Sequence, residues 1–483
     1  MMLLITGLTL ASLAAVQDTA LAPSRCGVLP QPQSPDTIDA AVLAWMRHSR
    51  TPAASIAIVR GGRTVTERAY GWADLATCVR ATPEMRFGIG SITKQITALG
   101  VLVLVSQGEL ALDDSISRWL PESGWAWRGI TVRHLLTHTS GIRDSGHDDQ
   151  VYPQIEIDKK IDVTDSALVA RLAAAPLNFP PGEGWAYSNT GYLLLSIIVQ
   201  RVGGTPFPIW MREHVFEPLG MHATRFFDPT EIIPALARGY TIERDGRLRQ
   251  GYYSSRSYSQ RGDMGIVSTA HDIALWSVEL DSSRLISPAL HALMLEPARL
   301  RDGSAFPYGF GVILDDYRGD PVLRHAGTYA AGYSANLLTL PARGIAVVVV
   351  TNQHQGDPWD FSATLLALAD STLPTIASLH AERDPTPERT RQLAALLNGD
   401  STAAPATPAW RRLMYPQIRG FLADELPLAV EFITCDNVAR SHIDRFGGTA
   451  ALECYYRLHH GTMDMTLSVL YTREGRITGM FPR

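Results

Sequence analysis

The chain has 483 residues, of which 46% are hydrophobic and 19% are charged, and 43 Lys and Arg against 48 Asp and Glu give a formal net charge of −5. This composition is typical of a globular protein with enough apolar residues for a large core. A near-neutral chain without basic runs lacks the concentrated positive patch that phosphate backbones require, so we expect no nucleic-acid partner.

The first 22 residues resemble a secretory signal peptide. Residues 1–16 are almost entirely apolar, and small residues around Ala14, Ala15 and Ala22 offer cleavage sites. No positive charge precedes the apolar stretch, however, and Pro23 would directly follow a cut at Ala22. The stretch is shorter than the ~20 residues that a membrane span needs, and so is the later apolar run from Ile345 to Val350. We therefore expect a periplasmic or secreted protein without a stable membrane span.

Four cysteines fit such an exported protein, because disulfides form in oxidising compartments. Cys26 and Cys78 flank the start of the expected fold, whereas Cys435 and Cys454 lie close together near its end. This spacing favours two local disulfides. Four cysteines allow three pairings, however, and buried free thiols are the alternative.

The elements expected after the leader alternate between strands at the ends and helices in the middle. A helix is predicted from Asp36 to His48, followed by a hairpin of strands Ala54 to Arg60 and Arg63 to Tyr70 around Gly61-Gly62. The helices predicted in the middle are Ser91 to Gly108, Ile130 to Thr137, Thr164 to Ala175, Asn189 to Val202 and Ala270 to Asp281. Strand patterns return at Gly309 to Leu314, Val322 to His325, Gly332 to Leu340 and Gly344 to Thr351.

Strands at both ends that enclose a helical insertion predict the α+β fold class, with one antiparallel sheet flanked by helices. Residues 384–408 then turn to Pro, Thr and Ala, which is typical of a linker. We therefore expect a larger domain at 23–383 and a small C-terminal α+β domain at 409–483. The small domain has a predicted helix, Ala409 to Ala423, and strands at Ala451 to Leu458, Met463 to Tyr471 and Arg476 to Phe481. It carries no chemical constellation that indicates a function.

The first candidate for catalysis is the segment Ser91-Ile-Thr-Lys94. Residues three apart on a helix share a face, so the serine hydroxyl would lie beside the amine. A neutral lysine can take the proton of a serine, whereas Arg cannot, and a helix N-terminus offers N–H groups to an oxyanion. Only Lys94, Lys159 and Lys160 are lysines, which leaves 43 − 3 = 40 Arg and favours a titrating lysine here. A fortuitous S-x-x-K is the alternative.

Two further short segments become candidates for the site because of their order along the chain. Tyr-Ser-Asn at 187–189 lies between a Pro-Pro-Gly turn and a predicted helix, where a phenol can relay a proton. A packing tyrosine followed by an Asn cap is the alternative. His-Ala-Gly at 325–327 is expected to close a strand, and its small residues would let a substrate lie alongside as an added strand.

In this order the three segments resemble the serine penicillin-recognising superfamily, in particular its class C β-lactamase, D-alanyl-D-alanine carboxypeptidase and esterase branch. The similarity covers roughly residues 35–370. It extends through Phe87-Gly-Ile-Gly-Ser-Ile-Thr-Lys, Ile130-Thr-Val-Arg-His-Leu-Leu-Thr-His-Thr-Ser-Gly, Pro181-Gly182, Pro218-Leu-Gly-Met and Val267-Ser-Thr-Ala-His-Asp. The resemblance implies a β-lactamase/DD-peptidase-like fold.

The resemblance also implies a role for each site residue. Ser91 would be the acylated nucleophile, with Lys94 and Tyr187 sharing the general-base work. The residues that it implies for substrate binding are Asn189, His325, Gly327 and Thr328. Asn189 would also position Lys94, and the backbone N–H groups of Ser91 and Thr328 would form the oxyanion hole.

One residue departs from the β-lactamases of this group, which usually have Lys where this chain has His325. Histidine with an ordinary pKa of about 6.5 is mostly neutral at pH 7, so we expect it to hold a β-lactam carboxylate less well. The H-x-G form instead resembles the peptidases and esterases of the branch. We expect the other histidines, His134, His138 and His271, to pack or to bond locally.

The sequence thus predicts a serine hydrolase that forms an acyl-enzyme on a D-amino-acid peptide, as a DD-carboxypeptidase or D-aminopeptidase does, or on a small ester. A β-lactamase is the alternative among enzymes, and a non-catalytic protein that binds peptidoglycan or a partner is the alternative outside them. We expect no cofactor and no metal, since the remaining His and Cys lack zinc-like spacing. The oligomeric state is not predicted.

Overall fold

The structure is a computed structural model of the chain. It describes residues 26–27, 29, 35–144, 162–243, 246–252, 255, 259–317, 320–356, 358–373, 382–422, 427–437, 444–445, 448–460 and 463–482. The expected signal peptide, residues 1–22, lies outside the described residues.

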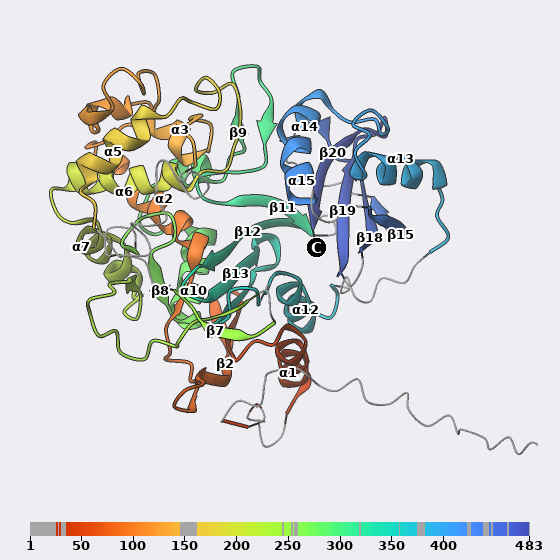
Figure 1. The fold of residues 1–483 in the computed structure, drawn as a ribbon, viewed down its shortest axis with the longest axis horizontal. Coiled ribbons are helices and arrows are strands. Elements are labelled where there is room, and N and C mark those ends of the chain that lie inside the picture. The colour runs from red at the N-terminus through yellow and green to blue at the C-terminus, as the bar shows by residue number, and fades with distance from the viewer. Residues whose placement is uncertain are drawn as a thin grey trace, which may run out of the picture.

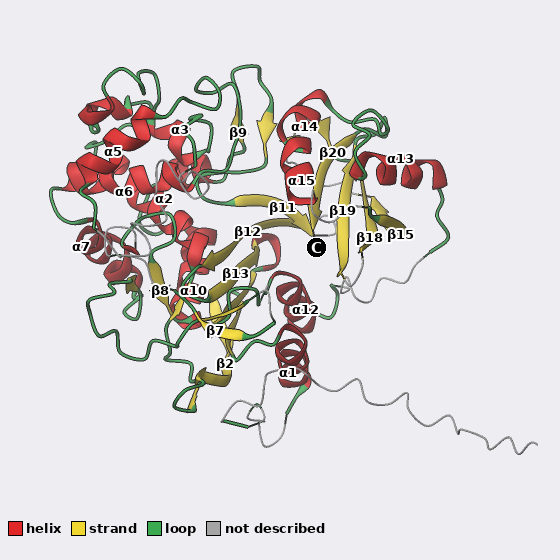
Figure 2. Ribbon diagram, viewed as in Figure 1, coloured by secondary structure: helices red, strands yellow, loops and turns green. Residues whose placement is uncertain are grey.

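The larger domain is built around a seven-stranded antiparallel sheet with the strand order β11-β12-β13-β14-β1-β2-β3 (Figures 1 and 2). Its strands in chain order are β1 (Ala53–Arg60), β2 (Arg63–Asp74), β3 (Val79–Arg80), β11 (Ile313–Tyr317), β12 (Asp320–Tyr329), β13 (Tyr333–Leu340) and β14 (Ile345–Thr351). β1 pairs with β14, with Ala57 opposite Val348, so the two ends of this domain meet in the middle of the sheet. The predicted antiparallel sheet is confirmed.

Two strand ends differ from the sequence-based expectation. β11 begins at Ile313 rather than Gly309, because Gly311 has a φ of +75° and lies against the backbone of Lys94. β12 does not close at the His-Ala-Gly segment but runs on to Tyr329, since residues 325–329 continue to pair with β13. β11 pairs with β12 only up to Arg324, so the described part of the chain leaves that edge of residues 325–329 without a strand partner.

Helices cover both faces of the sheet. α1 (Thr37–Ser49) and α12 (Trp359–Ala369) share one core cluster with Val347 and Val349. α10 (Ala270–Ser282) shares the opposite cluster with Val348 and Val350. Because successive strand side chains point to opposite faces, β14 is apolar at every position from 345 to 350. The continuous apolar run in the sequence therefore marks a strand that is buried on both sides.

The helical insertion carries most of the residues that surround the site. Its helices are α2 (Thr93–Ser106), α3 (Val132–Leu136), α5 (Asp165–Ala174), α6 (Asn189–Gly203), α7 (Phe207–Met211), α8 (Glu217–Leu219) and α11 (Pro288–Met294), with a π-turn at Arg212–Phe216. Its short 3-10 turns are Gly90–Ile92, Ile116–Arg118 and Pro121–Ser123. Its short strands are β4 (Phe87–Gly88), β5 (Arg225–Phe226), β6 (Tyr240–Ile242), β7 (Leu248–Gln250), β8 (Ile266–Ser268), β9 (Ala298–Arg299) and β10 (Ala305–Phe306). In the described part of the chain no single helix is long and apolar enough to cross a membrane, and only the bent pair Asn189–Gly203 and Phe207–Leu219 reaches that length and apolarity together.

The C-terminal part of the chain, from α13 on and here called the C-terminal domain, has a four-stranded sheet with the order β15-β18-β19-β20, which lies to the right of β11 in Figure 1. Its elements are α13 (Pro387–Leu397), α14 (Pro408–Leu413), α15 (Tyr415–Leu422), β15 (Ala429–Asn437), β16 (Asp444–Arg445), β17 (Gly448–Thr449), β18 (Leu452–His460), β19 (Met463–Tyr471) and β20 (Ile477–Pro482). The expectation of a linker over 384–408 was wrong for α13. Leu393 and Leu396 of that helix are fully buried in the core of the C-terminal domain, and this burial stabilises a helix that the Pro- and Thr-rich surroundings obscured.

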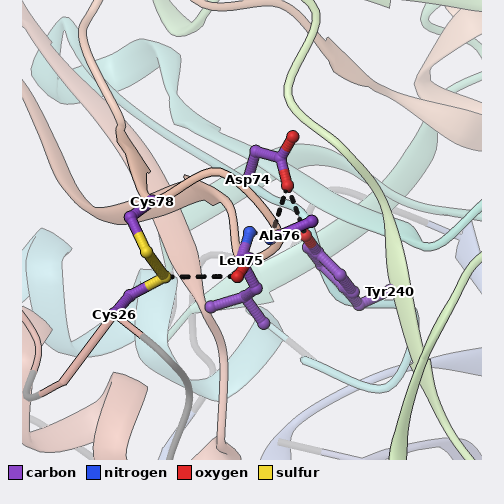
Figure 3. Close-up of a disulfide and its surroundings, with 6 residues drawn as sticks. All are labelled: Cys26, Asp74, Leu75, Ala76, Cys78 and Tyr240. Carbon is purple, nitrogen blue, oxygen red and sulfur yellow. Dashed lines mark hydrogen bonds between the residues drawn. A yellow bond between two sulfur atoms is a disulfide. The ribbon is translucent and has the colours of Figure 1, made fainter.

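Both favoured disulfides are present, and they use all four cysteines. Cys435 and Cys454 lie directly opposite each other on β15 and β18. The pair Cys26–Cys78 attaches the N-terminal segment to the turn after β2, where Tyr240 accepts a hydrogen bond from the backbone of Leu75 at 2.7 Å (Figure 3). The disulfides therefore fasten one element near each end of the chain.

Candidate active site

Ser91 is held in a single 3-10 turn, Gly90–Ile92, rather than in the first turn of a long helix as expected. The preceding Gly90 has a φ of +51°, and a Cβ at that position would lie 2.6 Å from the backbone nitrogen of Thr328. A Cβ on Gly327 would lie 2.8 Å from the nitrogen of Ser91. Only glycine fits both positions, so the turn and β12 approach backbone to backbone. Ser91 is therefore presented directly against the strand that carries Thr328.

Lys94 stands in the first turn of α2 with its side chain fully buried. Its Nζ lies 3.0 Å from Ser91 Oγ, 2.8 Å from Asn189 Oδ1 and 2.8 Å from the backbone oxygen of Asp263. An amide oxygen and a backbone carbonyl oxygen can only accept hydrogen bonds. A neutral amine must use its two N–H groups toward these two oxygens, and its lone pair is then directed at the hydroxyl of Ser91. The contact set thus prepares Lys94 to receive the serine proton.

Asn189 is the first residue of α6, and its amide is held from both ends. Its Oδ1 accepts from Lys94, while its Nδ2 donates to Asp144 Oδ2 at 3.1 Å. Ser188 caps the same helix by accepting from the backbone of Gly191. The helix start therefore fixes the position of Asn189 relative to Lys94.

Tyr187 lies just before α6 and shields the lysine from one side. Nζ of Lys94 is 4.9 Å from the centre of the Tyr187 ring. His138 packs on the same ring with 4.5 Å between centroids, and its Nδ1 accepts from the backbone nitrogen of Ser188 at 3.2 Å. Burial, with Lys94 nearby, holds the pKa of His138 well below its ordinary value, so this histidine is neutral. His138 thus packs and bonds locally, as expected, and does so directly behind Tyr187.

His325 faces the site from β12 but is almost completely buried. Its Nδ1 donates to the oxygen of Ala326 at 2.6 Å, so its Nε2 accepts from the hydroxyl of Tyr308 at 3.2 Å. Burial and the positive charge of Lys94 lower the pKa of His325 to about 3. The sequence-based assumption of an ordinary histidine pKa was therefore wrong. This side chain stays neutral through the physiological range.

Asp263 is a buried carboxyl group whose proximity to Lys94 was not anticipated. Its backbone oxygen accepts from Lys94, and its Oδ1 has no hydrogen-bond partner among the described residues. Burial raises the pKa of this carboxyl to about 6, against the opposing effect of Lys94. Near pH 7 it therefore places a negative charge close to Nζ of Lys94.

The structure brings together Ser91, Lys94, Tyr187, Asn189, His325, Gly327 and Thr328. Sequence reasoning missed Asp144, Asp263 and Tyr308, which lie outside the three short segments. Asp144 has a weak signal, because it follows the Thr-His-Thr-Ser-Gly run closely. Asp263 and Tyr308 have no local pattern that distinguishes them from other residues of their type.

The two other histidines for which no catalytic role was expected lie outside the site. His134 caps α3 with Thr131, and His271 pairs with Glu67. No group of three or more His, Cys, Asp or Glu that could hold a metal ion occurs in the described part of the chain.

Comparison with known proteins places this arrangement among hydrolases. The Beta-lactamase family model matches residues 38–371. Penicillin-binding protein 4* of Bacillus subtilis (strain 168) is 27% identical over 428 residues, which are 80% of this chain and 92% of that protein. Esterase EstB of Burkholderia gladioli is 31% identical over 354 residues, 65% of this chain and 89% of the esterase.

A D-aminopeptidase of Brucella anthropi is 27% identical over 292 residues, 59% of this chain and 54% of that enzyme. Among solved structures, the octameric penicillin-binding protein homologue from Pyrococcus abyssi matches with a TM-score of 0.60 at 22% identity. That match covers 92% of this chain and 89% of the other, so the shared fold includes residues beyond the family match.

Proposed function

The chain belongs to the Beta-lactamase family and is a serine hydrolase, and on this premise we propose that it acylates Ser91 with a D-amino-acid peptide or a small ester. The observation that carries the proposal is the contact set of Lys94. Two of its three neighbours can only accept, so the neutral amine directs its lone pair at Ser91 Oγ. A protein that only binds its ligand has no need of a nucleophile paired with a buried base.

In the proposed acylation, the Oγ of Ser91 forms a bond to the carbonyl carbon while its proton passes to Lys94. The carbonyl oxygen becomes an oxyanion that accepts from the backbone N–H groups of Ser91 and Thr328. The bond to the leaving group then breaks, and Tyr187 passes it the proton that Lys94 holds. This restores the neutral amine and leaves an ester on Ser91.

Hydrolysis of the ester follows the same route. A water oxygen forms the new bond to the carbonyl carbon, and a water proton passes through Tyr187 and Lys94 to Ser91 Oγ as the ester bond breaks. The product acid leaves and the serine hydroxyl is regenerated. Atoms and protons balance without a cofactor.

The preference for peptides or esters over β-lactams rests on His325. A neutral imidazole whose two nitrogens already bond to Ala326 and Tyr308 gives no positive charge to a substrate carboxylate. The relatives named as an esterase and as a D-aminopeptidase support the same preference. β-Lactam hydrolysis is the second candidate, favoured by the penicillin-binding relative.

The decisive experiment is covalent labelling of the wild type and of Ser91→Ala with a fluorophosphonate and a fluorescent penicillin. We expect the wild type to be labelled and the variant to show none. Ser282→Ala, on the exposed last turn of α10, is the matched control and should label fully. Undiminished labelling of Ser91→Ala would place the nucleophile elsewhere. A panel of chromogenic esters, D-peptides and lactams then ranks the substrates.

A further inference from the structure

Asp144 binds the start of α6 with both carboxylate oxygens. Oδ1 accepts from the backbone nitrogens of Asn189 at 2.8 Å and Thr190 at 3.3 Å. Oδ2 accepts from Nδ2 of Asn189 at 3.1 Å. The opposite end of the same amide accepts from Lys94 at 2.8 Å. Asp144, Asn189 and Lys94 therefore form one continuous hydrogen-bonded chain that ends on Ser91.

The chemistry of the two ends decides which way the amide points. An ionised carboxylate has no hydrogen to donate, so the group of Asn189 that faces it must be the NH₂. The carbonyl oxygen is then forced toward Lys94. Without this constraint, the amide could turn and direct its NH₂ at the amine of Lys94.

We propose that Asp144 is a positioning residue for the reaction at Ser91, because it holds the Asn189 amide with its oxygen toward Lys94. The inference rests on the proposed function and assigns Asp144 no contact with substrate. An oxygen at that place binds one N–H of Lys94 and leaves the lone pair to Ser91. An NH₂ at that place would instead donate to the lone pair and take it away from the serine.

The charged and titratable groups around Lys94 on the described elements set the background for a pH test. They are Asp263 before β8, His325 on β12, His138 after α3, Tyr187 before α6 and Tyr192 on α6. None of them shares a described hydrogen bond with Asp144, but the charge of Asp144 helps to raise the pKa of Asp263. Asp144→Asn and Asp144→Ala both remove that charge. A difference between these two variants therefore reports the path through Asn189.

A purely structural reading is that Asp144 only caps the N-terminus of α6, as Asp commonly does. The two readings predict opposite rankings of two variants. Asn is a good cap and Ala a poor one, so capping alone makes Asp144→Ala the more damaging change. If Asp144 positions the amide, Asp144→Asn is the more damaging change to activity. The NH₂ of the new Asn side chain would face the NH₂ of Asn189 and make the Asn189 amide turn around.

The test measures fluorophosphonate acylation rates of Asp144→Asn and Asp144→Ala against pH, together with thermal unfolding. We expect Asp144→Asn to acylate about 10- to 100-fold more slowly at pH 7, the usual size of a loss from misplaced groups. Its acid limb should lie at lower pH than that of Asp144→Ala, which loses the same charge, because an NH₂ facing Lys94 disfavours the ammonium form. Asp144→Ala should acylate faster than Asp144→Asn although it is less stable to heat.

Two further variants complete the design. In an Asn189→Ala background, Asp144→Asn and Asp144→Ala should acylate at rates within twofold of each other, since both lose the same charge and the amide through which they differ is gone. Thr164→Ala removes the cap of α5 and serves as the matched capping control, with an unchanged pH profile. A more active Asp144→Asn than Asp144→Ala, or an acid limb at the same pH in both variants, would overturn the proposal. Labelling of Ser91→Ala would instead overturn the proposed function, so the two failures are distinguishable.

Discussion

The surroundings of Ser91 and the surface that joins the C-terminal domain to the larger domain are built from different interactions. Around Ser91, buried polar groups hold one another through Lys94, Asn189 and Asp144 at distances of 2.8–3.1 Å. The core of the C-terminal domain, in contrast, is continuous with apolar residues of the larger domain.

This shared core reaches the active site. Trp185 stacks on Phe306 with 3.6 Å between ring centroids, and both belong to the same cluster as Trp410 of α14. Tyr308 belongs to the cluster as well, and its hydroxyl bonds to His325. The exposed ion pair Arg412–Asp302 lies across the same boundary and contributes little. Reactivity thus depends on a few polar contacts around Ser91, whereas the aromatic residues behind them depend on apolar packing from the C-terminal domain.

The largest expected effect is that of removing the C-terminal domain by ending the chain at residue 383. The truncation exposes Trp185, Phe306 and Tyr308, so we expect a core that precipitates or folds without being acylated. Expression yield, circular dichroism and fluorophosphonate labelling measure this. A well-folded, fully reactive core would show that the active site does not depend on packing against the C-terminal domain.

Lys94→Arg tests the polar contacts around Ser91. The change keeps the charge but removes the ability to act as a base, so acylation should fall at least ~10²-fold. The matched packing change is Trp410→Ala, which should lower the free energy of unfolding by about 3–5 kcal/mol while the folded fraction still reacts. Acylation rates and urea unfolding of both variants separate the two effects. Near-native acylation of Lys94→Arg would reduce the lysine to an electrostatic role.

His325→Lys places a cation between the two regions, beside Tyr308. A charge-assisted hydrogen bond exceeds a neutral one by roughly 1 kcal/mol or more, so β-lactam acylation should rise about tenfold relative to ester acylation. In the wild type this ratio should stay constant from pH 7.5 to 6, because His325 with a pKa of about 3 is neutral at both values. Stopped-flow acylation with both substrates gives the ratio, and His271→Lys is the exposed control. A ratio that rises in wild type below pH 7 would show that His325 is charged.

A separate effect, on stability and not on reactivity, is expected at Asp263. Burial raises its pKa from 3.8 to about 6, so between these values the native state binds more protons than the unfolded state. The contribution of this carboxyl to the free energy of unfolding is therefore fully present below pH 3.8. It is lost as the pH rises through 6. Asp263→Asn should be more stable than wild type at pH 8 by on the order of 2–3 kcal/mol, with the difference shrinking toward pH 4. Equal differences at both pH values, in urea unfolding, would contradict the shifted pKa.

The part of the site that the sequence determines is local. Ser91 and Lys94 are three residues apart, so a single helical turn is enough to bring hydroxyl and amine together. The hairpin around Gly61-Gly62 and the apolar run of β14 follow equally from local pattern, as do the α+β class and the pairing of neighbouring cysteines.

Tertiary packing decided the rest, because burial and long-range contacts have no signature in a short stretch of residues. Asn189 and Asp263 are 95 and 169 residues from Lys94, and only the packing of α2 against α6 and the approach to β8 bring their oxygens to it. The low pKa of His325 comes from burial beside Lys94, which its neighbours in sequence do not reveal. α13 looked like a linker for the same reason, since its helix is stabilised by the core that Leu393 and Leu396 join.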